Sequence, residues 1–184
     1  MYGFLSQYVR YAIGDHTTPP MIRPAAAPVS GVRAFAGWRR MTERNHENQA
    51  LVRVVFEAFN AGDVERVAAL CAPDFTLHDI PAGPTLRGPA GMRLWLQTWL
   101  EAAPDAHAKL ERIFGQGDWV ATEHHGTATH TGPLRRPTGE IPATGRALDL
   151  WFSENCEVRG GKLRQMRAYY DGAAVMRQLG LLPE

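Results

Sequence analysis

The stretch that decides the fold runs from Trp119 to Asp171 and reads WVATEHHGTATHTGPLRRPTGEIPATGRALDLWFSENCEVRGGKLRQMRAYYD. It contains three runs in which apolar and polar residues alternate, at 119–130, 148–158 and 163–170. Because successive side chains of a β-strand point to opposite faces, each run predicts a strand with two distinct surfaces. The pair Gly160-Gly161 between the last two runs predicts a hairpin turn. The stretch therefore predicts three strands in succession.

The same alternation assigns particular side chains to the inward face of each predicted strand. An acid, Glu154, falls on an otherwise apolar stripe, and His124 falls on the inward face of the first strand. The residues predicted to face inward are Val120, Thr122, His124, Gly126 and Ala128 in the first run, Leu148, Leu150, Phe152 and Glu154 in the second, and Met166, Ala168 and Tyr170 in the third.

Helices are predicted before and after this stretch. Apolar residues spaced by three and four predict a helix over 46–59, a second one capped by Asp63 and ended by Pro73, and a third opened by Gly88-Pro89. Strands are expected over 75–80 and 106–114, and a short helix over 173–179. Helices segregated from a run of long antiparallel strands indicate an α+β domain.

Composition narrows the class of protein. The chain has 184 residues, 45% hydrophobic and 21% charged, which fits one globular domain. Residues 41–184 hold 15 basic and 18 acidic side chains, so no basic surface for nucleic acid is expected. No apolar run approaches the roughly 20 residues of a membrane span. Two cysteines, Cys71 and Cys156, make no disulfide framework, so we expect a cytoplasmic protein.

The first 40 residues differ from the rest. They hold five Arg, one acid and several prolines. We expect a disordered basic tail over 1–40 that packs little against a domain spanning 41–184. Two alternatives stay open: upstream sequence included by an early start, with Met41 as the natural beginning, or a targeting segment.

Four short motifs follow one another in the central stretch: THTG at 129–132, IPATGR at 141–146, GKL at 161–163 and YYD at 169–171. Their order and spacing resembles the SnoaL-like polyketide cyclase family, within the superfamily that includes ketosteroid isomerase and limonene-epoxide hydrolase. The resemblance covers roughly residues 48–182. It implies a cone-shaped fold, in which a curved, mostly antiparallel sheet wraps on three helices around a blind apolar pocket.

The resemblance also implies where the acid and base should lie, and here the sequence departs from it. The family's catalytic Asp follows the Arg of the last strand, but Arg167 is followed by Ala168. A Gln and a His of the cyclases match Phe152 and Glu154, and the Arg-x-Asp pairing of the epoxide hydrolases is missing from 119–130. We therefore expect Glu154 to be the catalytic acid/base, with His78 and His124 as partners, because a carboxyl in a dry pocket has a raised pKa.

Each of these residues has a simpler structural interpretation. His78 could lie at an exposed loop edge, His124 could be a hydrogen-bonded core residue, and Glu154 could pair with Arg146 or Arg167. The pocket wall, and so the substrate-binding surface, is expected to comprise Trp95, Trp99, Phe152, Met166 and Tyr170. We expect no metal site, because His124 and His125 face opposite sides, and no cofactor, because no dinucleotide or phosphate loop is present.

The resemblance implies a cofactor-independent enzyme of secondary metabolism that closes a ring in a polyketide-like molecule by an aldol-type reaction. Epoxide opening, hydration or isomerisation in the same pocket is the first alternative. A non-catalytic binding or dimerisation module is the second. We also expect a homodimer, because Trp151 and Tyr169 lie on the outward face of the sheet, where large aromatic side chains need cover.

Overall fold

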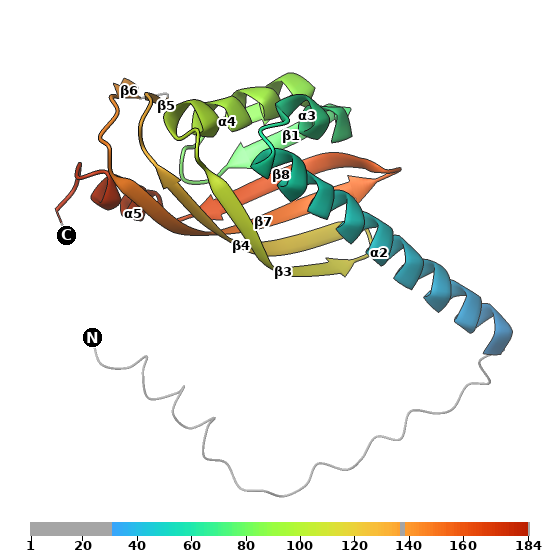
Figure 1. Ribbon diagram of the computed structural model, residues 1–184. Helices are drawn as coiled ribbons and strands as arrows, with labels where there is room; N and C mark the ends of the chain where they lie inside the picture. Colours follow the sequence, from blue (N-terminus) through green and yellow to red (C-terminus); the bar gives the residue numbers. More distant parts are fainter. Residues whose placement is uncertain (1–30, 137–138, 184) are drawn as a thin grey trace, which may run out of the picture. The chain divides into compact units, whose positions relative to one another are not determined.

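The computed structural model describes residues 31–136 and 139–183 (Figure 1). Four helices lie in these ranges: α2 (Gly31–Asn60), α3 (Val64–Leu70), α4 (Gly88–Ala102) and α5 (Gly172–Gln178). Most of the predicted tail, residues 1–30, lies outside the described residues. The first predicted helix is longer than its apolar pattern indicated, since α2 begins at Gly31 rather than near His46. Residues 31–40, assigned to the disordered tail, are therefore helical.

One six-stranded sheet dominates the fold, with the strands in the order β2-β1-β8-β7-β4-β3. Neighbouring strands are antiparallel except β1 and β8, which run parallel. The strands of this sheet are β1 (Cys71–Asp79), β2 (Thr85–Arg87), β3 (His107–Gln116), β4 (Trp119–Thr129), β7 (Ala147–Arg159) and β8 (Lys162–Tyr170). A separate two-stranded ribbon joins β5 (Leu134–Arg136) to β6 (Gly139–Ile141). The mixed α+β architecture confirms the predicted fold class.

Local chemistry explains several of these boundaries. Asp63 caps α3 by accepting a hydrogen bond from the backbone N–H of Arg66 at 2.9 Å. Asp171 caps α5 in the same way, accepting hydrogen bonds from the backbone N–H groups of Ala173 and Ala174. Gly160 and Gly161 have φ values of +60° and +67°, which the predicted two-residue hairpin between β7 and β8 requires. The three-residue strands β2, β5 and β6 carry no periodic pattern and were not predicted.

The helices cover one face of the sheet, and the core lies between them. Figure 1 shows α3 and α4 above the sheet. The helix α2 contacts β3 through Asn60, which is hydrogen-bonded to the backbone of Ala108, and β4 through Phe56, whose ring meets His124. Fully buried side chains from helices and strands meet in this layer, among them Val52, Phe75, Leu77, Met92, Leu163 and Met166. A second cluster of buried residues packs α5 against β7. The sheet's inner face is therefore the wall of any pocket that the helices enclose.

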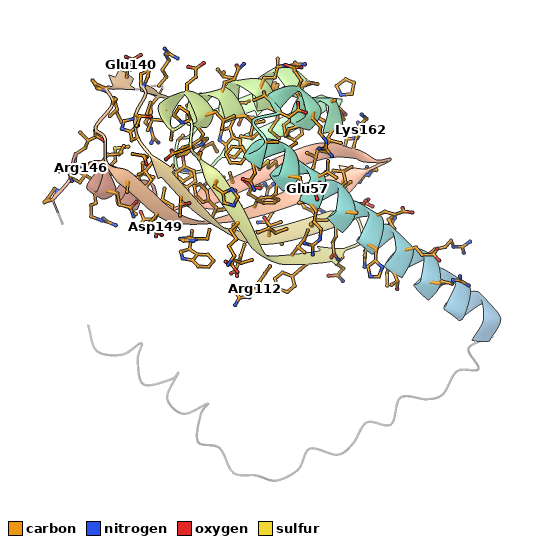
Figure 2. The ribbon with its side chains drawn as sticks, viewed as in Figure 1. Glu57, Arg112, Glu140, Arg146, Asp149 and Lys162 are labelled. Carbon is orange, nitrogen blue, oxygen red and sulfur yellow. The ribbon has the colours of Figure 1, made fainter. Side chains whose placement is uncertain are left out.

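The other face of the sheet is left open by the helices. Figure 2 shows Arg112 and Asp149 on this side, pointing away from α3 and α4. Four large aromatic side chains are exposed here or at its edge: Phe114, Trp119, Trp151 and Tyr169. Within the described residues, no helix is long and apolar enough to cross a membrane.

Strand register places the functional candidates in two neighbouring rows on the inner face. In the first row, Asp79 of β1 pairs with Ala168 of β8, which pairs with Glu154 of β7. In the second row, Tyr170 of β8 pairs with Phe152 of β7, which pairs with His124 of β4. One row thus carries two carboxyl groups on either side of an alanine, and the other carries three rings.

Candidate active site

Glu154 is a buried acid without a partner. Its position on β7 alternates with Leu150 and Phe152, which turns it inward, and only 4% of its surface is exposed. Among the described residues, its side chain takes part in no hydrogen bond or ion pair. Neither Arg146 nor Arg167, considered above as a partner, pairs with it, and both are exposed. Burial raises the pKa of Glu154 to about 8, so this carboxyl is mostly protonated at neutral pH.

His124 lies near Glu154 on the inner face, one strand away and displaced by two positions along it. Its ring stacks on Phe152 with centroids 4.8 Å apart and meets the edge of Phe56 at 4.9 Å. Burial lowers the pKa of His124 to about 4, and its Nδ1 has no hydrogen-bond partner among the described residues. The imidazole is therefore neutral at pH 7 and packed as an aromatic ring with one unused polar atom.

These two residues face a common cavity, here called the Glu154 pocket. Its volume is about 80 Å³, and its wall is mostly apolar. Four of the five predicted substrate-binding residues line it, namely Trp95, Trp99, Phe152 and Met166, together with Glu154 and His124. Gly126 allows the Phe152 ring to lie against β4, because a Cβ at this position would be only 2.9 Å from a carbon of that ring. The structure thus brings together most of the predicted site.

His78, predicted as a partner of Glu154, lies away from the Glu154 pocket. Phe75, Leu77 and Asp79 point inward from β1, so His78 points to the opposite face. There its ring contacts Thr85 at 3.1 Å and Gln165 at 3.3 Å. It does not line the Glu154 pocket. The alternative interpretation of His78, a residue at the edge of the sheet, agrees with this position.

Asp79, the next residue along, is the inward acid that the sequence analysis missed. It is 6% exposed, and its Oδ2 accepts a hydrogen bond from the Trp95 indole N–H at 2.9 Å. Its Oδ1 accepts from the Tyr170 hydroxyl at 3.0 Å and from the backbone N–H of Ala82 at 3.1 Å. Two of these donors cannot accept, and both carboxyl oxygens are used, which is the arrangement that suits an ionised carboxylate. The alternation of Phe75, Leu77 and Asp79 along the strand is the feature of the sequence that indicates its inward position.

Asp79 and Tyr170 belong to a second cavity, here called the Asp79 cavity. Its volume is about 280 Å³, and it is lined by Trp95, Trp99, Leu134, Arg135, Arg136 and other residues of β2, α4 and β5. Trp95 and Trp99 line both cavities and so form their shared wall. Tyr170, predicted to bind substrate, therefore lies beside the Asp79 cavity. Burial and the neighbouring Asp79 raise the pKa of the Tyr170 hydroxyl, so it remains a hydrogen-bond donor.

His130, from the THTG motif, has a structural position. It is fully buried, and its Nδ1 lies 3.0 Å from the Thr144 hydroxyl, which ties the two halves of the loop together. Across the ranges 31–136 and 139–183, no three His, Cys, Asp or Glu side chains cluster as metal ligands would. The side chains that line the two cavities include two carboxyls, the phenol of Tyr170 and the neutral imidazole of His124.

Comparison with known proteins identifies the family. A model of the SnoaL-like polyketide cyclase family matches residues 49–179. The aklanonic acid methyl ester cyclase DauD of Streptomyces sp. (strain C5) is 33% identical over 138 residues, covering 71% of this chain and 80% of the relative. DnrD of Streptomyces peucetius, named for the same activity, is 32% identical over 133 residues, covering 71% and 88%.

A solved structure agrees with these relatives. The structure of IdmH from Streptomyces antibioticus superposes with a TM-score of 0.60 at 28% identity, covering 72% of this chain and 98% of IdmH. The matched region contains the whole six-stranded sheet and the loop motifs that first suggested the resemblance. The chain therefore belongs to the SnoaL-like polyketide cyclase family.

Proposed function

We propose that the protein closes a ring in an aromatic polyketide by an intramolecular aldol reaction without a cofactor. The relatives DauD and DnrD are named as cyclases of aklanonic acid methyl ester, which supports ring closure as the reaction. The observation that carries the proposal is the row Asp79–Ala168–Glu154, which places a hydrogen-bonded carboxyl and a buried, protonated carboxyl on one face of the sheet. Aldol closure needs both a base for a C–H proton and an acid for the oxygen.

Asp79 is assigned the role of the base. Its carboxylate takes a proton from the carbon between two carbonyl groups and leaves an enolate. Hydrogen bonds from Trp95, Tyr170 and Ala82 hold the carboxylate in place. Since one hydrogen-bonded strand separates β1 from β7, the Cα atoms of the two acids are roughly 10 Å apart. A substrate that uses both acids must span this distance.

Glu154 is assigned the role of the acid. The enolate carbon attacks a ketone of the same molecule, a C–C bond forms, and the ketone oxygen becomes an alkoxide. The Glu154 carboxyl gives its proton to that oxygen, so the product is an isomer of the substrate. A pKa of about 8 keeps the proton in place until the oxygen becomes basic. The neutral ring of His124 shapes the pocket beside it.

The test is the rate of ring closure with aklanonic acid, as the methyl ester and as the free acid. Glu154→Gln keeps the shape and removes the transferable proton, so the rate should fall about a hundredfold or more. Glu157→Gln is the matched control, because Glu157 lies on the same strand and is bound to Arg159 at 2.8 Å on the other face. If Glu154→Gln stays within a few-fold of wild type, Glu154 is not the acid, and His124 becomes the next candidate.

The homodimer and the cytoplasmic setting are also proposals. Trp151 is 56% exposed and Tyr169 is 38% exposed on the open face of the sheet, and association of two such faces would cover both. A monomeric mass by light scattering at micromolar concentration would contradict the dimer.

A further inference from the structure

The Glu154 pocket is too small to hold the proposed substrate by itself. Its volume of about 80 Å³ compares with roughly 300–1,000 Å³ for typical small-molecule sites. The Asp79 cavity offers a further 280 Å³ on the other side of Trp95 and Trp99. If the reaction uses both acids, the substrate must extend from one cavity into the other.

The charges of the Asp79 cavity differ in how they are paired. Asp79 is satisfied by three hydrogen-bond donors. Arg135 forms ion pairs with Glu101 and with Glu140 from the surrounding surface. Arg136 is half-buried and forms no ion pair with any described residue. The cavity therefore contains one guanidinium whose charge no acid of the described chain neutralises.

Arg136 also lies close to the reacting end of the site. It lines the same cavity as Asp79 and Tyr170 and lies within hydrogen-bond reach of the Tyr170 hydroxyl. Burial and Asp79 raise the pKa of that hydroxyl, and the charge and hydrogen bond of Arg136 oppose this effect. A guanidinium offers several N–H donors in one plane and binds a carboxylate through two parallel hydrogen bonds. Trp99 and Tyr170 flank this position with flat apolar surface, which suits a fused-ring ligand.

We propose that Arg136 binds a free carboxylate of the substrate in the Asp79 cavity, so that this enzyme prefers a polyketide acid over its ester. The inference rests on the proposed function for the identity of the ring system. It goes beyond that function by adding a residue that selects the substrate and by naming the group that it selects. Arg135, although adjacent, is already paired and does not contribute to the preference.

Isothermal titration calorimetry with two inert probes tests the subsite separately from catalysis. Anthraquinone-2-carboxylate and its methyl ester differ in the charged group only, and neither can be cyclised. Wild type should bind the acid about tenfold or more tightly than the ester, as a charge-assisted bidentate contact allows. Arg136→Gln should remove this preference by weakening the binding of the acid probe while leaving that of the ester unchanged. Arg136→Lys should retain part of the preference.

The matched control is Arg135→Gln, which should keep the preference for the acid. Glu154→Gln should keep the preference for the acid as well. The binding preference therefore tests the Arg136 subsite even if the protein turns out not to close rings. Thermal melting of Arg136→Gln should stay close to that of wild type, because no ion pair is lost and the Tyr170 hydroxyl keeps its hydrogen bond to Asp79. The proposal is overturned if wild type binds both probes equally, if Arg136→Gln keeps the preference, or if Arg135→Gln loses it.

Discussion

The Glu154 pocket and the Asp79 cavity share two tryptophans but hold their acids in opposite ways. Asp79 has three hydrogen-bond donors around it, whereas Glu154 has none among the described residues. The two side chains stand in one row of the sheet, on either side of Ala168. Two carboxyls on one face of the sheet thus have different surroundings, and such a difference is how a base and an acid can coexist at one pH.

The family's acid in the last strand is absent at Ala168, and its neighbours explain how the site can work without it. An ionised third carboxyl at this position would lie between Asp79 and Glu154. Alanine keeps this part of the wall apolar and fully buried, which preserves the burial that raises the pKa of Glu154. In the proposed mechanism the acid and the base therefore lie on the two flanking strands.

Asp79→Asn should have the largest combined effect, because Asp79 has partners to lose. An asparagine offers one acceptor oxygen, so at least one of the Trp95, Tyr170 and Ala82 donors loses its acceptor. We expect the free energy of unfolding to fall by about 1–3 kcal/mol and ring closure to slow about a hundredfold or more. Urea denaturation and the ring-closure assay measure the two effects.

The control for Asp79→Asn is Asp74→Asn on the same strand, where the acid is exposed and paired with Arg164 alone. That change should lower the free energy of unfolding by less than about 1 kcal/mol and leave the rate of ring closure unchanged. Equal losses in both variants would mean that Asp79 has no special place in the site.

A smaller effect is expected in the pH dependence of stability. The pKa of Glu154 is near 8 in the folded protein and 4.5 as its ordinary value, so between these pH values the folded chain holds a proton that the unfolded chain has released. Stability must then fall as pH rises through this window. His124, with a pKa of about 4, acts oppositely, but only below its ordinary 6.5.

Between pH 6.5 and 8, therefore, Glu154 changes the stability with pH and His124 does not. Across this range the free energy of unfolding of wild type should fall by roughly 1–2 kcal/mol relative to that of Glu154→Gln. The reason is that each proton held only by the folded chain changes this free energy by about 1.4 kcal/mol per pH unit. Parallel urea curves of the two proteins measure the difference. Curves that keep a constant separation would show that Glu154 is already ionised at pH 6.5.

The contrast between the acids also separates what the sequence could predict from what it could not. Glu154 and His124 were placed inward because they lie in long alternating strands that pair with sequence neighbours. Asp79 was missed although Phe75 and Leu77 indicate its face, because β1 pairs in parallel with the distant β8. Its donors, Trp95 and Tyr170, come from α4 and β8, and no local pattern brings those three residues together.

The most direct test of the central claim is the titration of the Glu154 carboxyl itself. Carbon-13 NMR of protein labelled at the glutamate side-chain carboxyl, with Glu154→Gln used to assign the signal, gives its pKa. The structure predicts a carboxyl that remains protonated at pH 7 and titrates near 8. A Glu154 signal that titrates near the ordinary 4.5 would show an ionised side chain at neutral pH and would contradict its assignment as the acid.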